Sequence, residues 1–437
     1  MGTPTRPPPT RGGDRGAVVG VAVWSLCLVA AWAGGRWLAG RGAVVTYGGA
    51  PPFLGYLHVR LSPGTVAALV LAVLVAAWGP WCARAASWQV LLLAAWVTSA
   101  AFAACLATTD GLSGLTTPMR GEHDYLAVVP RAAAAPGDFL RTFVERAPDY
   151  PVHVRGHPPG FPLLLAGMDR VGLGGAGWAA ALVIVVGTSA VVAVAVTIRA
   201  LAAEAGEGVV RLAAPATVLA PWVLWVATSA DAFYAGVLAW GVALLAIAST
   251  SRGRWWPWAL AAGLVLGLCP FLSYGLLPMG ALALVVGVCT RRWAPTVVAG
   301  AVVVGSVVAW AAAGFWLLDG LAMTHTESTL GRAAERPYLY FVVADLVLMG
   351  ALVGPAGVGG VVGLGRLPRP VRELVGVALG AALVGALSGV ERGEVERIWL
   401  PLACWVLPAA ALVPQRRWLV AQAAVTVVLQ VVLVSPW

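Results

Sequence analysis

The sequence predicts an all-α protein, a polytopic transmembrane helix bundle of about thirteen spans. The 437 residues are 60% hydrophobic and only 11% charged, so stretches of about 20 apolar residues recur along the whole chain. The basic residues are all arginine and lie in short segments between these stretches. Acidic residues and histidines gather in other connections. No soluble domain of ordinary size is left over.

The N-terminal segment divides into a tail and a first span. Residues 1–15 are rich in Pro, Gly and Arg, cannot bury a core, and are expected to be a disordered cytoplasmic tail. The apolar run from Gly16 to Leu38 is long enough to cross a membrane and lacks a small-residue cleavage pattern. We therefore interpret it as a membrane helix and not as a signal peptide.

The spans alternate with short arginine-bearing connections. We expect spans at 17–39, 65–83, 88–107, 176–200, 211–228, 232–249, 256–272, 275–290, 296–317, 340–364, 373–389, 398–413 and 418–435. With the N-terminus in the cytoplasm, the inside connections hold Arg84, Arg199 to Arg211, Arg252, Arg254, Arg291, Arg292, Arg366, Arg369, Arg372, Arg416 and Arg417. This agrees with the positive-inside bias. The Ala, Val, Gly and Arg usage is typical of a high-GC bacterium and indicates a multi-pass protein of a bacterial plasma membrane.

The same topology places most acidic residues and all five histidines on the extracytoplasmic face. Acidic residues contribute little to membrane orientation, so their accumulation on one face points to chemistry there. The alternative is that long outer loops simply hold more polar residues. The active face is therefore expected to be extracytoplasmic.

The longest connection, at about 108–175, carries the strongest motif. An acidic cluster, Glu122 and Asp124, follows a span, and a short helix within 137–145 puts Phe139, Leu140 and Phe143 on one face. Such a helix is expected to lie along the membrane surface. The segment His157-Pro158-Pro159-Gly160 then opens the next helix.

This order resembles the GT-C membrane glycosyltransferases, specifically the bacterial enzymes that use polyprenyl-phosphate sugars. In that superfamily the first external loop of the core carries an acidic catalytic base and, further along, a His-Pro-Pro or Lys-Pro-Pro segment. Glu122, Asp124 and His157 match that order. The resemblance implies a core at 88–437 with external loop 108–175, and an additional N-terminal transmembrane hairpin at 16–87. The family's adjacent Asp-Glu pair appears here as Glu122-His123-Asp124-Tyr125, so either carboxylate can be the base, and Asp124 is preferred.

Sugar transfer from a lipid phosphate explains these residue types. A carboxylate, Asp124 or Glu122, would take the proton of the attacking acceptor hydroxyl. Cationic groups would hold the departing phosphate. His157 and Arg155 are candidates where the loop returns to the membrane, and the resemblance adds Arg397. The structural alternatives are a helix-capping histidine and ordinary solvated loop acids.

Five further residues are candidate substrate contacts: Tyr125, Asp231, Tyr274, Asp345 and Glu396. Asp231 begins a span and could instead be its N-cap. Asp345 lies about one turn inside a span and should face a cavity or an arginine such as Arg336. Tyr274, at an outer turn, could stack on a sugar or prenyl group, although tyrosine is common at interfaces.

Two charged segments complete the expected outer face. Glu396 lies with Arg397 in a cluster whose carboxylates could also favour a helix N-terminus. The segment from Asp319 to Tyr338 is polar enough to be a mobile loop over the site. His325 and Glu327 within it have no recognised metal-ligand spacing. We expect no metal ligands and no required cofactor.

The leading interpretation is a glycosyltransferase that works on the outer face. Its expected partners are a polyprenyl-phosphate-sugar donor, a cell-envelope glycan or glycolipid acceptor, and membrane lipids, with no nucleic acid. The alternative is a transporter or flippase of lipid-linked saccharides, which would place charges along a path between spans. Asp345 is the clearest intramembrane charge, so the enzyme is favoured. A noncatalytic membrane scaffold is a third reading.

Overall fold

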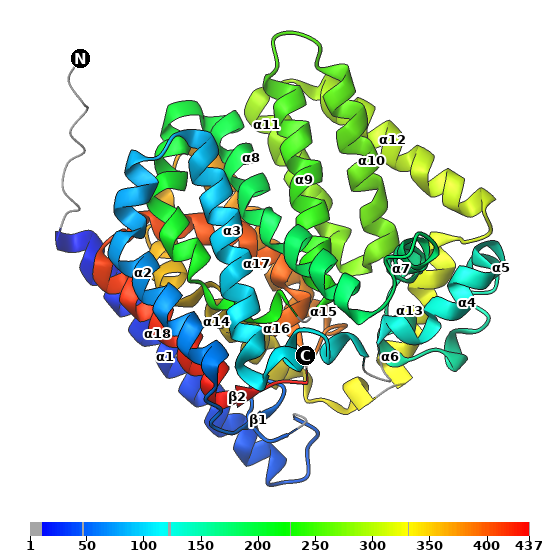
Figure 1. The fold of residues 1–437 in the computed structure, drawn as a ribbon, viewed down its shortest axis with the longest axis horizontal. Helices are drawn as coiled ribbons and strands as arrows, with labels where there is room; N and C mark the ends of the chain where they lie inside the picture. The colour runs from blue at the N-terminus through cyan, green and yellow to red at the C-terminus, as the bar shows by residue number, and fades with distance from the viewer. Residues whose placement is uncertain (1–10, 46–47, 121–123, 228, 331, 437) are drawn as a thin grey trace.

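The computed structural model describes residues 11–45, 48–120, 124–227, 229–330 and 332–436. The helices of the bundle stand side by side across most of the molecule (Figure 1). They are α1 (Arg11–Ala39), α2 (Pro63–Ala85), α3 (Trp88–Ala107), α8 (Ala176–Val218), α9 (Ala230–Thr250), α10 (Trp256–Leu272), α11 (Ala281–Thr290), α12 (Trp293–Ala312), α14 (Tyr338–Val361), α15 (Arg369–Ser388), α17 (Leu400–Val406) and α18 (Arg416–Val432).

Short elements gather at one end of the bundle. The 108–175 connection contains η1 (Thr108–Asp110), η2 (Leu112–Leu115), η3 (Pro118–Arg120), η4 (Tyr125–Val128), α4 (Val129–Ala134), α5 (Pro136–Arg141), η5 (Ala147–Asp149), α6 (Val152–Arg155) and α7 (Gly160–Arg170). Elsewhere lie η6 (Pro221–Trp225), η7 (Tyr274–Leu276), η8 (Pro278–Gly280), α13 (Leu317–Leu330), η9 (Arg332–Glu335), η10 (Leu364–Arg366), α16 (Val395–Ile398) and η11 (Leu407–Leu412). Strands β1 (Tyr56–Leu57) and β2 (Leu433–Val434) pair antiparallel.

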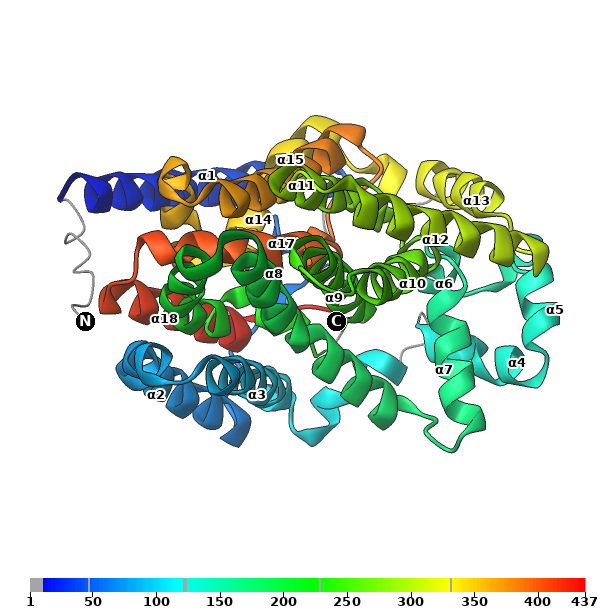
Figure 2. The ribbon, with the colours of Figure 1, turned by 90° about the horizontal axis from the view of Figure 1, so that it is seen from above.

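The helices pack in layers (Figure 2). Helix α1 packs on α14, and α2 and α3 pack together on the opposite side of the molecule. Between them run α8, α17 and α18, and α8 continues the packing to α9, which contacts α10. This places α9, α14 and α16 around the middle of one end of the bundle.

Local sequence explains where the helices begin. Ser62 and Thr65 form a reciprocal capping box at the start of α2, where Pro63 supplies a preset φ angle. Ser87 caps α3 by accepting a hydrogen bond from the Val90 backbone N–H. Ser229 does the same for α9 by accepting from the Asp231 N–H. Asp231 is therefore not the N-cap of this helix.

The all-α, polytopic architecture is confirmed, and the number of crossings stays a prediction. Among the described residues, eight helices are long and apolar enough to cross a membrane, and the shorter apolar helices are Trp256–Leu272, Tyr274–Thr290 and Leu400–Leu412. The expected spans 176–200 and 211–228 fall within α8 and the η6 segment after it. Ala203, at φ 47°, breaks the regular helix between them.

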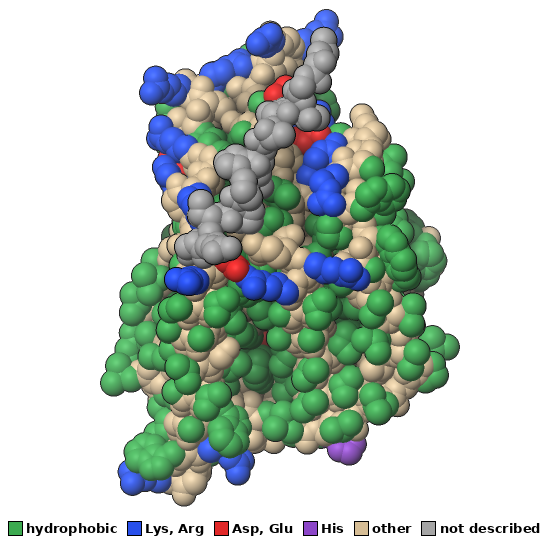
Figure 3. Space-filling view, turned by 90° about the vertical axis from the view of Figure 1, so that its left-hand side faces the viewer, with side chains coloured by type: hydrophobic (Ala, Val, Ile, Leu, Met, Phe, Trp, Pro, Cys, Tyr) green, Lys and Arg blue, Asp and Glu red, His purple; other side chains and the backbone are tan. Residues whose placement is uncertain are grey.

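The arginine-bearing connections meet at the end opposite to the 108–175 loop. The Arg211 guanidinium donates to the carbonyls of Ala83 at 2.7 Å and Ala86 at 2.9 Å. Arg292 reaches the carbonyls of Ser249 and Ser251 in the same way. On the side of the molecule that Figure 3 shows, a broad hydrophobic band separates the charged side chains above it from those below it. We call the two ends the arginine end and the loop end.

Two expectations for the loop end are wrong. The face of α5 expected on the membrane surface turns inward, because Phe139 and Phe143 are fully buried and pack with Tyr150 and Phe315. Aromatic packing within the protein removes the apolar face that would enter lipid. The segment expected as a mobile loop is largely the helix α13, which packs on α6.

The topology predicts opposite labelling of two loop positions. In a variant with its six cysteines replaced, Leu112→Cys at the loop end should react with a membrane-impermeant maleimide in intact cells. Gly253→Cys at the arginine end, where an added side chain meets open space, should react only after the cells are opened. Labelling of Gly253→Cys in intact cells would contradict the orientation.

Candidate functional site

A buried ion pair lies at the loop end, between α9 and α16. The Arg397 Nη1 lies 2.9 Å from the Asp231 Oδ2. Arg397 is 7% exposed and Asp231 is 2% exposed. Asp231 also accepts a hydrogen bond from the Ser229 hydroxyl at 2.8 Å. The structure thus joins two candidate residues that are far apart in the chain.

Glu394 ties this pair to a second arginine. Its Oε2 accepts from Arg397 Nη2 at 3.0 Å and its Oε1 from Arg336 Nη2 at 3.2 Å. Arg336 also donates to the carbonyl of Arg392. Glu394 has φ +66°, a left-handed conformation that costs a non-glycine residue on the order of 1 kcal/mol or more. The bridge between two guanidinium groups offsets that cost.

Asp124 lies beside the ion pair and is 8% exposed. It caps η4, and its Oδ1 accepts the Tyr125 backbone N–H at 2.7 Å. Burial raises the pKa of Asp124 to about 6, while that hydrogen bond and the Arg397 charge lower it less. Its carboxylate is therefore poised to exchange a proton near neutral pH. Glu122, the other candidate base, lies outside the described residues.

Aromatic rings form one wall of the site. The Tyr234 hydroxyl of α9 donates to the Tyr125 hydroxyl at 3.3 Å. The Tyr125 ring meets those of Phe161 and His157 edge to face, with centroids 5.0 and 5.9 Å apart. The His157 ring lies 6.0 Å from that of Tyr234. These contacts hold η4, α9 and the start of α7 together around Asp231.

His157 is held in one tautomer. Its Nδ1 lies 2.9 Å from the His153 carbonyl oxygen, which can only accept, so Nδ1 carries the hydrogen. Burial lowers the pKa of His157, although the Asp231 charge opposes this effect. A neutral ring then has a lone pair on Nε2 to accept a hydrogen bond. Without a bound anion, His157 is therefore a neutral hydrogen-bonding group and not a cation.

Arg155, the other loop cation, points to a different neighbour. Its Nε lies 3.3 Å from Glu327 Oε2 of α13, and both side chains are about one-third exposed. The Thr324 hydroxyl also donates to the Arg155 carbonyl. Arg155 therefore fastens α13 to α6. An ion pair this exposed adds roughly 0–1 kcal/mol, so it is easily exchanged for another anion.

Asp345 and Glu396 accept hydrogen bonds from backbone N–H groups. Asp345 accepts the Gly393 N–H at 3.1 Å and is completely buried, so it fixes the strained turn before α16. Among the described residues its hydrogen-bond donor is this backbone N–H, and not the expected Arg336. Glu396 accepts the Leu54 N–H at 2.9 Å, and burial raises the pKa of Glu396 to about 7. It fastens the segment before β1 to α16.

Tyr274 is covered by α13. A Cβ placed at Gly320 of α13 would collide with the Tyr274 hydroxyl oxygen, which is buried and has no hydrogen-bond partner among the described residues. The contact with α13 thus covers the hydroxyl end of the ring, while the residue as a whole is partly exposed. Tyr274 therefore belongs to the contact with α13, whereas the Asp231–Arg397 pair joins α9 and α16.

Sequence reasoning missed two residues of the site, Tyr234 and Glu394. Tyr234 lies one turn after Asp231 on α9, so it falls on the same face of that helix. Glu394 precedes Arg397 by three residues, a spacing that permits a helical ion pair. Of the described His, Cys, Asp and Glu residues, no group of three or more lies close enough to hold a metal ion.

The ion pair predicts a specific pattern of stability. Arg397→Met leaves the buried Asp231 without its cation, while Glu394 keeps Arg336, and the change should cost roughly 3–5 kcal/mol. Asp231→Asn combined with Arg397→Met should recover part of the loss. Thermal unfolding of the purified protein in one detergent, followed by tryptophan fluorescence, measures both. Equal midpoints for wild type and Arg397→Met would contradict a structural role for the pair.

Comparison with known proteins gives one weak structural similarity. No family model and no curated protein matches the sequence. Among solved structures, the chain is similar to the crystal structure of the Archaeoglobus fulgidus oligosaccharyltransferase in complex with Zn and sulfate. The TM-score is 0.39 and the identity 14%, over 64% of this chain and 45% of that one. The chain thus spans less than half of that protein, and its function has to be argued from its own site.

Proposed function

We propose that the protein is a membrane glycosyltransferase of the GT-C type, which moves a sugar from a polyprenyl-phosphate donor to a cell-envelope acceptor. The observation that carries the proposal is a buried carboxylate with a pKa near neutrality, Asp124, beside a buried arginine, Arg397. Sugar transfer from a lipid phosphate needs such a pair, a base for the acceptor hydroxyl and a cation for the leaving phosphate.

Asp124 acts as the base in this proposal. The ionised carboxylate takes the proton of the acceptor hydroxyl as the hydroxyl oxygen bonds to the anomeric carbon. The bond from that carbon to the phosphate oxygen breaks, and the electron pair leaves with the phosphate. A base with a pKa near 6 is mostly ionised at neutral pH and still accepts a proton efficiently.

Arg397 holds the phosphate. Asp231 and Glu394 hold its two terminal nitrogens, and a guanidinium group suits the geometry of phosphate oxygens. The anchors fix the guanidinium before substrate arrives. His157 assists, since a phosphate nearby favours the protonated ring and offsets the effect of burial.

The position of the buried charges supports an enzyme over a transporter or flippase. The buried charged residues in the described part of the chain are Asp124, Asp231, Asp345, Glu396 and Arg397. All of them belong to the loop end. A transport path would instead need polar groups deeper between the helices.

The base assignment predicts a selective loss of transfer. With purified protein in lipid and radiolabelled sugar on a panel of polyprenyl phosphates, Asp124→Asn should lower turnover about 100- to 10,000-fold, the range for loss of a general base. Donor binding should remain. Glu122→Gln is the matched control and should stay near wild type. The reverse pattern would make Glu122 the base, and full activity of both variants would refute the site.

The pKa of Asp124 predicts the acidic limb of the pH profile. Only the ionised carboxylate accepts a proton, so kcat/KM should rise with pH, reach half its maximum near pH 6, and level above it. The exposed loop variant Asp138→Asn should keep this profile. A limb of unchanged midpoint in the residual activity of Asp124→Asn would assign it to another group.

A further inference from the structure

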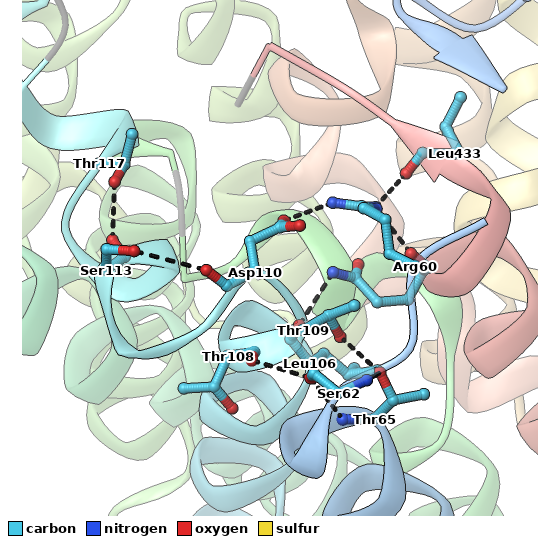
Figure 4. Close-up of polar contacts among 11 residues, drawn as sticks. Arg60, Ser62, Thr65, Leu106, Thr108, Thr109, Asp110, Ser113, Thr117 and Leu433 are labelled. Carbon is cyan, nitrogen blue, oxygen red and sulfur yellow. Dashed lines mark hydrogen bonds and ion pairs between the residues drawn. The ribbon is translucent and has the colours of Figure 1, made fainter. Parts of the chain in front are cut away.

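A polar cavity lies at the loop end, apart from the Asp231–Arg397 pair. It has a volume of about 400 Å³, within the range of small-ligand pockets. Its wall comes from four separate parts of the chain: Arg60 before α2, the η1–η3 turns, the η6 segment, and the C-terminal end of α18 with β2. Figure 4 shows the polar side of this wall.

The wall is rigidly built around Arg60. The Arg60 guanidinium pairs with Asp110 and donates to the carbonyls of Gln430, at 2.7 Å, and Leu433. The Gln430 amide donates to the Leu106 carbonyl at 2.8 Å. These bonds join the segment before α2, the end of α3 and the C-terminal strand at one point (Figure 4). The cavity therefore does not depend on a single flexible loop.

The groups left facing the cavity match a neutral, hydroxyl-rich ligand. Arg60 and Asp110 are the charged residues among the described lining residues, and they neutralise each other. The Asp110 carboxylate is about half exposed and has further acceptor capacity. The hydroxyls of Ser113 and Thr117 donate to the carbonyls of Asp110 and Ser113, and their oxygens can still accept hydrogen bonds from ligand hydroxyls. Trp225 also lines the cavity, but its ring is only 2% exposed, so it contributes an apolar edge and no open stacking face.

The cavity borders the proposed catalytic site through two segments. Trp225 ends η6, which contacts α16, and Ser229, which bonds Asp231, follows four residues later. Thr117 and Pro118 lead into the segment that ends at Asp124. The η6 segment therefore lines the cavity and also contacts the helix that carries Arg397.

We propose that this cavity is a glycan-binding subsite, which holds an internal sugar of the acceptor while the terminal sugar reaches Asp124. The proposal rests on the proposed function in taking the bound sugar as part of the acceptor. A glycan seated here selects acceptors by length, because a single sugar cannot fill both positions. Neutral sugars are preferred over phosphorylated ones, because Arg60 is already matched by Asp110.

Direct binding tests the subsite without any catalytic turnover. Fluorescently labelled mannose and arabinose tetrasaccharides are titrated onto the protein in nanodiscs, with the matching labelled monosaccharides alongside. At least one tetrasaccharide should bind, and at least tenfold more tightly than its monosaccharide. Thr117→Trp and, separately, Ser113→Trp should weaken this binding at least tenfold by filling the cavity.

The control is Leu112→Trp, on the same turn but outside the cavity wall, which should bind as wild type does. Absence of tetrasaccharide binding by the wild type, or equal binding by the Thr117→Trp and Ser113→Trp variants, overturns the subsite. Cleavage of the donor by water, measured separately, uses the proposed catalytic site around Asp124 and Arg397 and needs no acceptor glycan. Its absence with glycan binding intact would count against the proposed function and not against the subsite.

Discussion

The site depends on one buried arginine that carries two carboxylate partners. Placing Arg397 and Asp231 away from water costs several kcal/mol per ion unless geometry and further hydrogen bonds satisfy both. Ser229, Glu394 and, through Glu394, Arg336 supply those bonds. Because α9, the turn before α14 and α16 each contribute a member, the pair fixes how three distant parts of the chain meet.

Around this pair, polar side chains are used to fix backbone. Asp345 holds the Gly393 N–H, Glu396 holds the Leu54 N–H, and Arg60 holds carbonyls of the C-terminal segment. The N-terminal region thereby reaches the same end of the bundle as the last strand and as α16. The N-terminal hairpin at 16–87, which the sequence suggested to be an addition to the core, is thus connected to the candidate site and to the polar cavity around Arg60.

Sequence patterns predicted the helical bundle, because hydropathy and arginine placement act along the chain. They also selected Asp231 and Arg397 separately as candidates, and the structure brings these two side chains together. They predicted neither the inward face of α5 nor the helical form of α13, since both depend on partners such as Phe315 and Arg155 that are distant in sequence. The pairing of Asp231 with Arg397 spans the chain in the same way. Tyr234 was missed because a tyrosine inside an expected membrane span looks like an ordinary packing residue of the helix bundle.

The central claim is that Arg397 holds a lipid phosphate beside Asp124. A cryo-EM structure of the Asp124→Asn variant in nanodiscs with a polyprenyl-phosphate sugar tests it most directly. Phosphate density within hydrogen-bond distance of the Arg397 guanidinium, with the sugar directed toward residue 124, is the expected result. Phosphate density elsewhere, with none at Arg397, would contradict this role of Arg397.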